Sequence, residues 1–271
     1  MQSETFQKYK ELIYKHSGID LSDGKEALVS SRLAKRIREL GLRDEMEYYD
    51  FIAADRSIEE LTRLIDMMST NVTSFLRESL HFDLISEMLR KLWSNGPKKV
   101  KLWSAACSSG QEPYTLAMVV HDVARSKNVD PSLVSILATD ISTQILQQAD
   151  AGTYNQRELK DVPEEWIKRY FRKTSDVNSR QVADSIRSMV TFRRINLSIT
   201  PYPMKGPFDA VFCRNVMIYF DNSVRSRIVS ETYRLLRPEG YFMIGHSENL
   251  SGLSSQFKLT QPTVYRKEAA E

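Results

Sequence analysis

An acidic residue and a turn of small residues stand where two apolar segments end. Asp140 follows the apolar run 134–139, and its carboxylate can accept hydrogen bonds from two ribose hydroxyls. The turn 106–113 (ACSSGQEP) follows the run 100–105, and its small residues let the backbone approach a ligand closely. Neither G-x-G-x-x-G nor G-x-x-x-x-G-K-S/T occurs, which argues against a diphosphate site. These features favour a nucleoside cofactor without a diphosphate, and S-adenosylmethionine is the commonest of that kind.

Each feature also has a purely structural interpretation. The small turn would serve as a tight connection between a strand and a helix, and Asp140 would complement the dipole of a following helix. The segment 235–240 (LLRPEG), before the apolar run 241–245, is frequent in methyltransferases that use S-adenosylmethionine, although its turn chemistry is generic.

The cysteines and histidines predict no second site. Cys107 and Cys213 are the only cysteines, so a disulfide-stapled secreted scaffold is excluded, a cytoplasmic location is expected, and both thiols are interpreted as small buried apolar groups. The four histidines lack metal-ligand spacing, so no metal site is predicted. His246, Ser247 and Glu248 are consecutive and cannot converge as a hydrolytic triad, so we expect them near the pocket wall without an assigned role.

Length and composition indicate a globular protein of one large or two smaller domains. The chain has 271 residues, 41% of them hydrophobic and 27% charged, and a net charge of +3 that does not require a nucleic acid partner. The N-terminus is polar and no apolar run approaches about twenty residues, so we expect neither a signal peptide nor membrane insertion.

Two patterns divide the chain into 1–78 and 79–271. The first part predicts helices only, around 6–13, 29–40, 45–54 and 58–68, with Gly41 as a stop. The second alternates predicted strands (100–105, 134–139, 190–192, 208–213 and 241–245) with helices at 114–125, from a cap at Ser142 to 151, and from a cap at Asn222 to 235. Two late segments, 257–259 and 263–266, predict an antiparallel pair. The fold class is therefore α/β, a Rossmann-like, doubly wound, mostly parallel seven-stranded sheet behind an all-helical N-terminal domain.

Two further regions are candidates for partner binding. The basic residues Arg32, Lys35, Arg36 and Arg43 share one stripe of the second predicted helix, which is either a solvated face or a surface for an acidic partner. From about 155 to 190 the strand–helix rhythm breaks, with Trp166, Tyr170 and Phe171 suggesting a short helix. This segment is either an inserted small subdomain or a surface excursion.

Motifs along the whole chain, taken in order, carry a family resemblance. They are 69–78 (STNVTSFLRE), 103–114 (WSAACSSGQEPY), 138–142 (ATDIS), 208–220 (FDAVFCRNVMIYF) and 245–249 (GHSEN). On these residues the sequence resembles the bacterial chemotaxis receptor methyltransferases, the CheR family, from about Phe6 to Tyr265.

The resemblance implies transfer of a methyl group from S-adenosylmethionine to glutamate side chains of chemoreceptors, which leaves S-adenosylhomocysteine. Carried over by motif, the residues expected to bind the cofactor are Asn71, Thr73, Arg77, Glu112, Asp140, Asn196, Leu197, Arg214 and Asn215. It also places Arg77 and Tyr219 near the transferred methyl as candidate catalytic residues, where the alternatives are a surface ion pair of Arg77 with Glu78 or a neighbour and a core role for Tyr219. A glutamate carboxylate is ionised at neutral pH, so in-line displacement needs no general base.

The resemblance also implies the partners. It favours docking of the cytoplasmic domain of chemoreceptors on Arg32, Lys35, Arg36 and Arg43, and it identifies the insertion as the small β-subdomain with which some members bind a receptor's C-terminal peptide. The chain departs from the family at Leu76, where a second phenylalanine is frequent, and at Val72, which is commonly polar. We expect a monomer.

Two other functions remain open at this point. A methyltransferase for nucleic acid bases would carry Asp/Asn-Pro-Pro-Tyr where Arg214-Asn215-Val216-Met217 stands, and no stacking aromatics interleave with the basic stripe, so no nucleic acid partner is predicted. An adaptor that binds S-adenosylmethionine and receptors without turnover is the alternative function.

Overall fold

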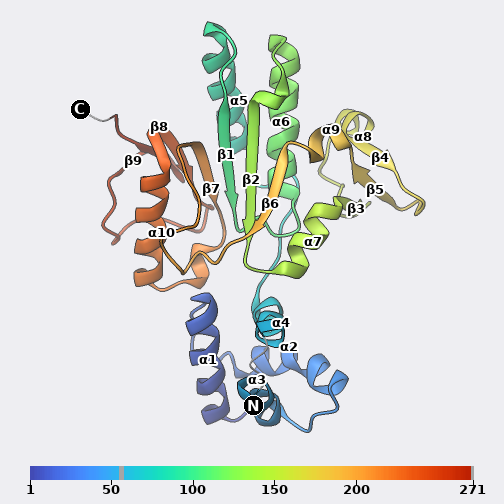
Figure 1. Cartoon of the computed structure of the whole chain (residues 1–271), viewed down its shortest axis with the longest axis vertical. Coiled ribbons are helices and arrows are strands. Elements are labelled where there is room, and N and C mark those ends of the chain that lie inside the picture. Colours follow the sequence, from blue (N-terminus) through green and yellow to red (C-terminus); the bar gives the residue numbers. More distant parts are fainter. Residues whose placement is uncertain (55–57, 270–271) are drawn as a thin grey trace.

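The computed structural model describes residues 1–54 and 58–269 and contains a helical N-terminal part, a large sheet and a small sheet (Figure 1). The N-terminal part consists of α1 (Ser3–Ser17), α2 (Glu26–Glu39), α3 (Glu45–Ala54) and α4 (Ile58–Met68), which confirms the prediction of helices there. Their apolar faces meet in a core of their own that includes Phe6, Tyr9, Leu33 and Tyr48.

The basic stripe was extended too far along α2. The helix ends at Glu39, and Gly41 adopts a left-handed conformation (φ 69°) that turns the chain away. Arg43 therefore lies beyond the helix, and the prediction that it shares a helical stripe with Arg32 and Arg36 is wrong.

The large sheet has seven strands in the order β6-β2-β1-β7-β8-β10-β9. The strands are β1 (Val100–Ala105), β2 (Val134–Asp140), β6 (Val190–Arg194), β7 (Phe208–Cys213), β8 (Leu236–Met243), β9 (Phe257–Gln261) and β10 (Val264–Lys267). β10 runs antiparallel to β8 and β9, and the other pairings are parallel, which confirms the mostly parallel sheet and its terminal antiparallel pair.

Helices cover both faces of this sheet because successive side chains of a strand point to opposite sides. They are α5 (Leu80–Leu92), α6 (Gln111–Lys127), α7 (Thr143–Ala151) and α10 (Asn222–Leu235), with short 3₁₀ turns η1 (Trp93–Asn95), η2 (Pro131–Leu133) and η3 (Met217–Tyr219). Leu102 joins the core with α5 and α6, whereas its neighbour Trp103 joins the core with α10. The doubly wound fold is confirmed, and among the helices that cover the sheet the sequence patterns had missed α5.

Two predicted boundaries near α10 need correction. The cap of this helix is Asp221, whose carboxylate accepts a hydrogen bond from the Val224 N–H at 2.8 Å, and not Asn222. β8 already begins at Leu236, so the expected turn before the strand lies inside it. The register between β7 and β8 shifts between Phe208 and Ala210, which accommodates that turn as an irregularity of the ladder.

The insertion forms a small subdomain beside α6 and α7 (Figure 1). It contains β3 (Thr153–Asn155), α8 (Glu164–Tyr170), β4 (Phe171–Lys173), β5 (Ser179–Val182) and α9 (Asp184–Arg187), with an antiparallel sheet in the order β3-β5-β4. Asp122 of α6 accepts hydrogen bonds from Trp166 and Arg169 at 2.9 and 2.8 Å, which attaches α8 to the main domain.

In the described part of the chain, no helix has the length and apolar character needed to span a membrane.

Candidate functional site

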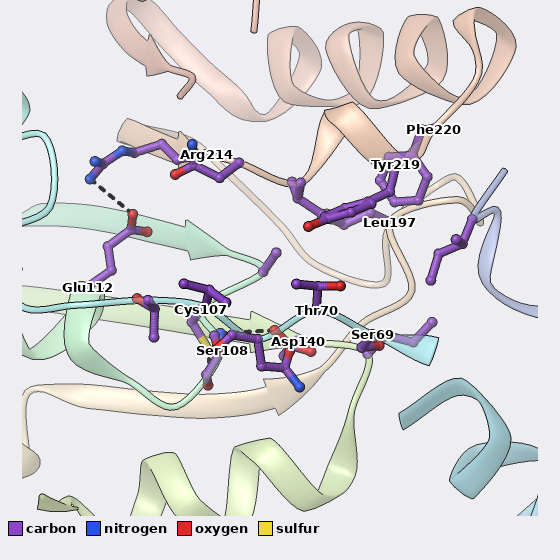
Figure 2. A pocket seen from close by; sticks show the side chains of 18 of the residues that line it. Ser69, Thr70, Cys107, Ser108, Glu112, Asp140, Leu197, Arg214, Tyr219 and Phe220 are labelled. Carbon is purple, nitrogen blue, oxygen red and sulfur yellow. Dashed lines mark hydrogen bonds and ion pairs between the residues drawn. The ribbon is translucent and has the colours of Figure 1, made fainter. Parts of the chain in front are cut away.

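A cleft of about 990 Å³, its open mouth included, lies where the carboxyl ends of β1, β2, β6 and β7 face the N-terminal helices. Ligands of doubly wound sheets bind at this edge. Every residue that was predicted to bind the cofactor lines the cleft, and so does Tyr219. Arg214 and Glu112 lie at one end of the cleft, and Leu197, Tyr219 and Phe220 lie toward the other (Figure 2).

Asp140 ends β2 with its carboxylate held in place by backbone groups. It accepts hydrogen bonds from the N–H groups of Ser108 and Ser142 at 2.9 and 3.0 Å. Burial raises the pKa of Asp140, and these hydrogen bonds oppose that shift. The backbone N–H of Ile141 also acts on this carboxylate, and since a carboxylate has about four acceptor sites, capacity remains for a ribose hydroxyl.

The turn after β1 brings the backbone close to the cleft. Ala106, Ser108 and Gly110 have φ angles of 57°, 50° and 94°, all in the left-handed region. A Cβ on Gly110 would lie 2.9 Å from the Tyr154 hydroxyl, so only glycine fits there. Cys107 is buried in this turn, and burial raises the pKa of its thiol, which confirms its interpretation as a small apolar group.

One buried arginine joins two carboxylates at the end of the cleft, and we call Glu78, Glu112 and Arg214 the polar junction. The Arg214 side chain is only 2% exposed, and its guanidinium lies 3.0 Å from Glu78 Oε2 and 3.2 Å from Glu112 Oε2. The Ser104 hydroxyl donates to the other oxygen of Glu112 at 2.6 Å. Burial raises the pKa of Glu112 although Arg214 opposes this. For Glu78, burial is outweighed by Arg214 and by hydrogen bonds, so its pKa is lowered.

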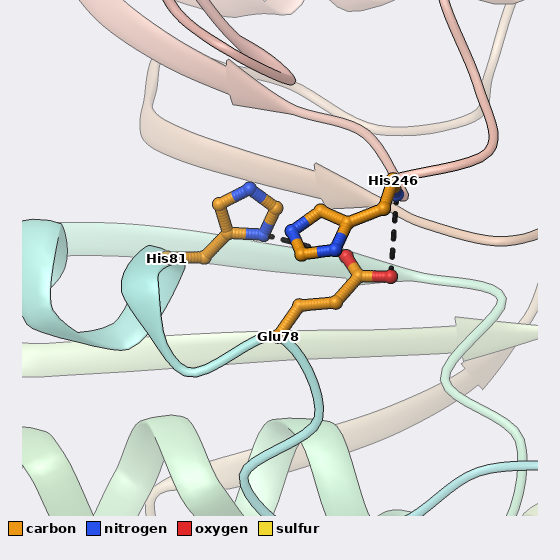
Figure 3. A group of neighbouring side chains, drawn as sticks. All are labelled: Glu78, His81 and His246. Carbon is orange, nitrogen blue, oxygen red and sulfur yellow. Dashed lines mark hydrogen bonds and ion pairs between the residues drawn. The ribbon is translucent and has the colours of Figure 1, made fainter.

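Tertiary structure also gathers Glu78, His81 and His246, whose candidate ligand atoms lie within 4.8 Å of one another (Figure 3). Glu78 Oε1 accepts from the Asn215 amide and the His246 N–H, and Oε2 accepts twice from Arg214. These four bonds use the acceptor capacity of the carboxylate, and the guanidinium repels a cation. Burial and nearby Arg214 lower the pKa of His81 to about 4, so it is neutral at pH 7. Within the group, the backbone N–H of His246 donates to Glu78, and His81 Nδ1 lies 3.9 Å from the same carboxylate.

Arg77 sits in a constrained stretch of backbone at the cleft. Its neighbours Leu76 and Glu78 have φ angles of 57° and 55°, its own carbonyl accepts a hydrogen bond from Arg214, and its guanidinium donates to the Val72 carbonyl at 2.9 Å. Among the described residues, no ion pair joins Arg77 to Glu78, which pairs with Arg214 instead. In the part of the chain that the structure describes, the Val72 carbonyl is the only hydrogen-bond acceptor of the Arg77 side chain, so its other N–H groups can bind a ligand.

Tyr219 ends η3 and lines the cleft, half-buried, rather than filling the core. Its carbonyl accepts a hydrogen bond from the Asp20 N–H at 2.8 Å, and the next residue, Phe220, forms a β-bridge with Ile19. The segment that follows α1 thus holds the backbone of Tyr219 from the N-terminal side.

Asn196 connects the same two parts of the molecule. Its amide nitrogen donates to the His16 carbonyl at 2.8 Å, and its amide oxygen accepts from the N–H and hydroxyl of Ser198. A Cβ on Gly18 would lie 2.4 Å from the Ser198 Cβ, so the helix end approaches the sheet domain as closely as glycine allows. Part of the bonding capacity of Asn196 is therefore used between the domains.

The predicted docking residues lie in the helical N-terminal part, and none of the four lines the cleft, although Arg32 contacts lining residues at the end of α4. Arg32 donates to the Thr70 hydroxyl at 3.0 Å and to the carbonyl groups at the end of α4. Arg36 forms a bidentate pair with Glu60 at 2.8 and 2.6 Å. Lys35 and Arg43 have side chains that are 83% exposed, and their ion pairs in the described part of the chain are with the neighbouring Glu39 and Glu47.

Several lining residues were not predicted from the sequence as site residues. Ser17 and Ile19 lie at the end of α1, Met68 and Thr70 lie at the end of α4, and Phe220 lies directly after η3. Ordinary polar and apolar residues at helix ends carry no chemical signal in a sequence. Their place in the cleft follows from the contact between the two domains.

Comparison with known proteins identifies the family. Residues 71–266 match the family described as "CheR methyltransferase, SAM binding domain", and residues 4–69 match "CheR methyltransferase, all-alpha domain". The chain is 37% identical over 262 residues to the "Chemotaxis protein methyltransferase" of Escherichia coli (strain K12), covering 96% of this chain and 89% of that protein. It is 38% identical over 264 residues to "Chemotaxis protein methyltransferase 2" of Pseudomonas aeruginosa, covering 97% and 92%. With both domains matched and the cleft at the cofactor edge of the sheet, the chain belongs to the CheR family of methyltransferases, and its cofactor is S-adenosylmethionine.

Proposed function

We propose that this protein is a protein-glutamate O-methyltransferase that forms methyl esters on glutamate side chains of chemoreceptors. The observation that carries the proposal is the convergence of Arg77 and Tyr219 with all the expected cofactor residues in one cleft, although they come from segments far apart in the sequence. We further propose that residues 1–78 supply receptor docking and the linker that completes the cleft, and that 79–271 carry the cofactor.

The cleft has donors and acceptors that fit S-adenosylmethionine. In our proposal Asp140 accepts a ribose hydroxyl with its free acceptor capacity, and Glu112 accepts the amino group of the methionine part. The other residues that hold the cofactor are Asn71, Thr73, Arg77, Asn196, Leu197, Arg214 and Asn215. The turn after β1 brings Ala106, Cys107 and Ser108 to the lining of the cleft, where they can contact the cofactor.

The cofactor supplies an electrophilic methyl group on a sulfonium, so an in-line displacement by a glutamate carboxylate leaves S-adenosylhomocysteine. The carboxylate is ionised at neutral pH, with a usual pKa of about 4.3, so the protein needs no general base. Its task is orientation, which can contribute roughly 7–11 kcal/mol at its limit. We assign this task to the fork of Arg77 and the hydroxyl of Tyr219, which bind the carboxylate without protonating it.

The basic surface formed by α2 and by Arg43 in the loop after it is the proposed docking site for the acidic cytoplasmic domain of a receptor, which places the reaction in the cytoplasm. Lys35 and Arg43 are exposed and can contact the receptor directly. Arg32 and Arg36, which are engaged internally, support this face and contribute their charge. We also propose that a receptor C-terminal peptide adds to the small sheet β3-β5-β4, raising the effective concentration of the substrate for a monomeric enzyme.

A labelling experiment tests the proposal. The protein is mixed with methyl-tritiated S-adenosylmethionine and membranes that contain the chemoreceptors of its host, and the receptor band is treated with base. Label released as volatile methanol is expected, because carboxyl methyl esters are base-labile. Tight binding of S-adenosylhomocysteine without label on any receptor would contradict turnover and favour the adaptor function instead.

A further inference from the structure

Glu248 lies behind the cleft with a carboxylate that is surrounded by backbone N–H groups. The residue is 7% exposed, and no ion pair of Glu248 occurs in the described part of the chain. One oxygen accepts from Val216 and Met217 at 3.0 and 2.7 Å, and the other accepts from Asn215 and Gly245 at 2.8 and 2.5 Å. Charge-assisted hydrogen bonds of this kind are about twice as strong as neutral ones.

Three of the four N–H groups that Glu248 binds belong to residues 215–217, which lead from β7 into η3. Asn215 adopts a left-handed conformation there (φ 59°), which a residue other than glycine keeps only when its surroundings hold it. Two of the bonds of Glu248 go to Asn215 and the next residue, Val216. The same turn leads directly into η3, which ends at Tyr219.

Gly245 makes room for this arrangement. A Cβ at this position would lie 2.3 Å from the Asn215 amide nitrogen and 2.9 Å from its backbone nitrogen. Glycine is thus required where β8 leads to Glu248, because the two turns touch.

We infer that Glu248 is a positioning residue for methyl transfer: its carboxylate holds the backbone of 215–217 and so sets the places of Asn215 and Tyr219 in the cleft. This inference rests on the proposed roles of those two residues. Glu248 does not line the cleft, so it acts through them and not on the ligand. Together with the hydrogen bond from the Asp20 N–H to the Tyr219 carbonyl, it fixes this segment from two sides.

A carboxylate suits this position better than its neutral isostere. Glutamine would keep one carbonyl oxygen for two of the N–H groups but turn its NH₂ group toward the other two. Two donors then face each other in a buried place, which leaves backbone groups without an acceptor. We expect the backbone of 215–217 to move away from the NH₂ group of the glutamine.

The test compares Glu248→Gln with Ser247→Ala, a neighbouring exposed residue that leaves the four bonds intact. For Glu248→Gln we expect kcat for receptor methylation to fall about 100-fold, because misplacement by about 1 Å can cost that much. The Kd for S-adenosylhomocysteine should rise about 10-fold, which corresponds to the loss of about one hydrogen bond through Asn215. If kcat and the Kd for S-adenosylhomocysteine of Glu248→Gln both equal those of Ser247→Ala, the inference is overturned, whether or not the Tm of Glu248→Gln is lower.

Further variants keep the test decisive. The double variant Glu248→Gln/Tyr219→Phe should be as active as the less active of the two single variants, because both changes act on one unit. If the activity losses of the two single variants multiply in the double variant, Glu248 does not act through Tyr219. If Glu248→Gln does not fold, Gly245→Ala takes its place, since it keeps the carboxylate but presses on Asn215. If the wild type forms no methyl ester, the proposed function fails, and the affinity for S-adenosylhomocysteine alone decides the inference.

Discussion

The polar junction and the basic face of α2 are both clusters of charged residues, yet the structure uses them in opposite ways. In the polar junction, Arg214 is 2% exposed and bonds to two carboxylates and a carbonyl group. On α2, Lys35 is 83% exposed and lies 3.7 Å from one neighbouring glutamate. Buried charges keep a fixed geometry because their partners cannot be replaced by water, whereas exposed charges contribute mainly a long-range field.

Arg36 shows that α2 carries both buried, paired charges and exposed ones. It belongs to the basic stripe by sequence, but its bidentate pair with Glu60 makes it a structural residue of the N-terminal domain. The Tyr48 hydroxyl donates to the same carboxylate at 2.8 Å. A stripe of like charges therefore does not by itself show which members are free to bind a partner.

In the cleft, removal of one oriented cation should abolish most of the activity. Arg77→Ala is expected to lower kcat/KM for receptor methylation by about 10²–10³-fold, the usual cost of losing one preorganised donor at a reacting group. Initial rates of base-labile methyl ester formation measure this effect.

The matched control for Arg77→Ala is Arg90→Ala, since Arg90 is an exposed residue of α5 outside the cleft lining. Arg90→Ala should keep wild-type turnover, and both variants should keep a Tm near that of the wild type. Near-wild-type turnover of Arg77→Ala would remove Arg77 from the catalytic role.

On α2, the buried pair should affect stability rather than turnover. Arg36→Gln leaves the Glu60 carboxylate buried without its cation, so the free energy of unfolding should fall by about 3 kcal/mol. Lys35→Gln, one residue earlier, should change it by no more than about 0.5 kcal/mol because its pair is exposed. Urea denaturation of the two variants gives the comparison, and equal losses would contradict it.

The pH dependence of this difference has a definite sign. The hydrogen bond from Arg36 is the main cause that lowers the pKa of Glu60 in the folded state. Its stabilising effect is therefore present above the unfolded pKa and is lost as the pH falls through the folded pKa. The gap in stability between wild type and Arg36→Gln should narrow below about pH 4.

Reversal of the exposed charges should produce a small effect on receptor binding. The double variant Lys35→Glu/Arg43→Glu is expected to raise the KM for the receptor about 3- to 10-fold at low salt and less at high salt, because exposed charges act through a screened field. The Kd for S-adenosylhomocysteine should not change.

Lys98→Glu/Lys99→Glu is the matched control for this charge reversal, since both lysines are exposed at the amino end of β1, opposite to the cleft. A KM that stays at the wild-type value in Lys35→Glu/Arg43→Glu, or rises equally in the control, would argue against docking on the basic surface of α2 and the loop after it.

Much of the fold could be predicted from the sequence, because β1 and β7 are short apolar runs with clear ends. Their predicted bounds agree with the structure, and Ser142 caps α7 as expected, accepting a hydrogen bond from the Ile145 N–H. The errors lie where local patterns compete. Two neighbouring residues, Asp221 and Asn222, can both cap α10, and the turn within β8 contains Pro238 and Gly240, which usually end a strand.

The chain by itself determined its elements, its family motifs and the residues that gather at the cofactor edge, because periodicity and strand ends are local properties. Only the tertiary structure decided which partners the charged residues contact. It engaged Arg32 and Arg36 in internal contacts, joined Glu78 to Arg214, and placed the Glu248 carboxylate against a turn more than thirty residues earlier in the chain. Such contacts depend on distances between elements that are remote in sequence, and no local pattern records them.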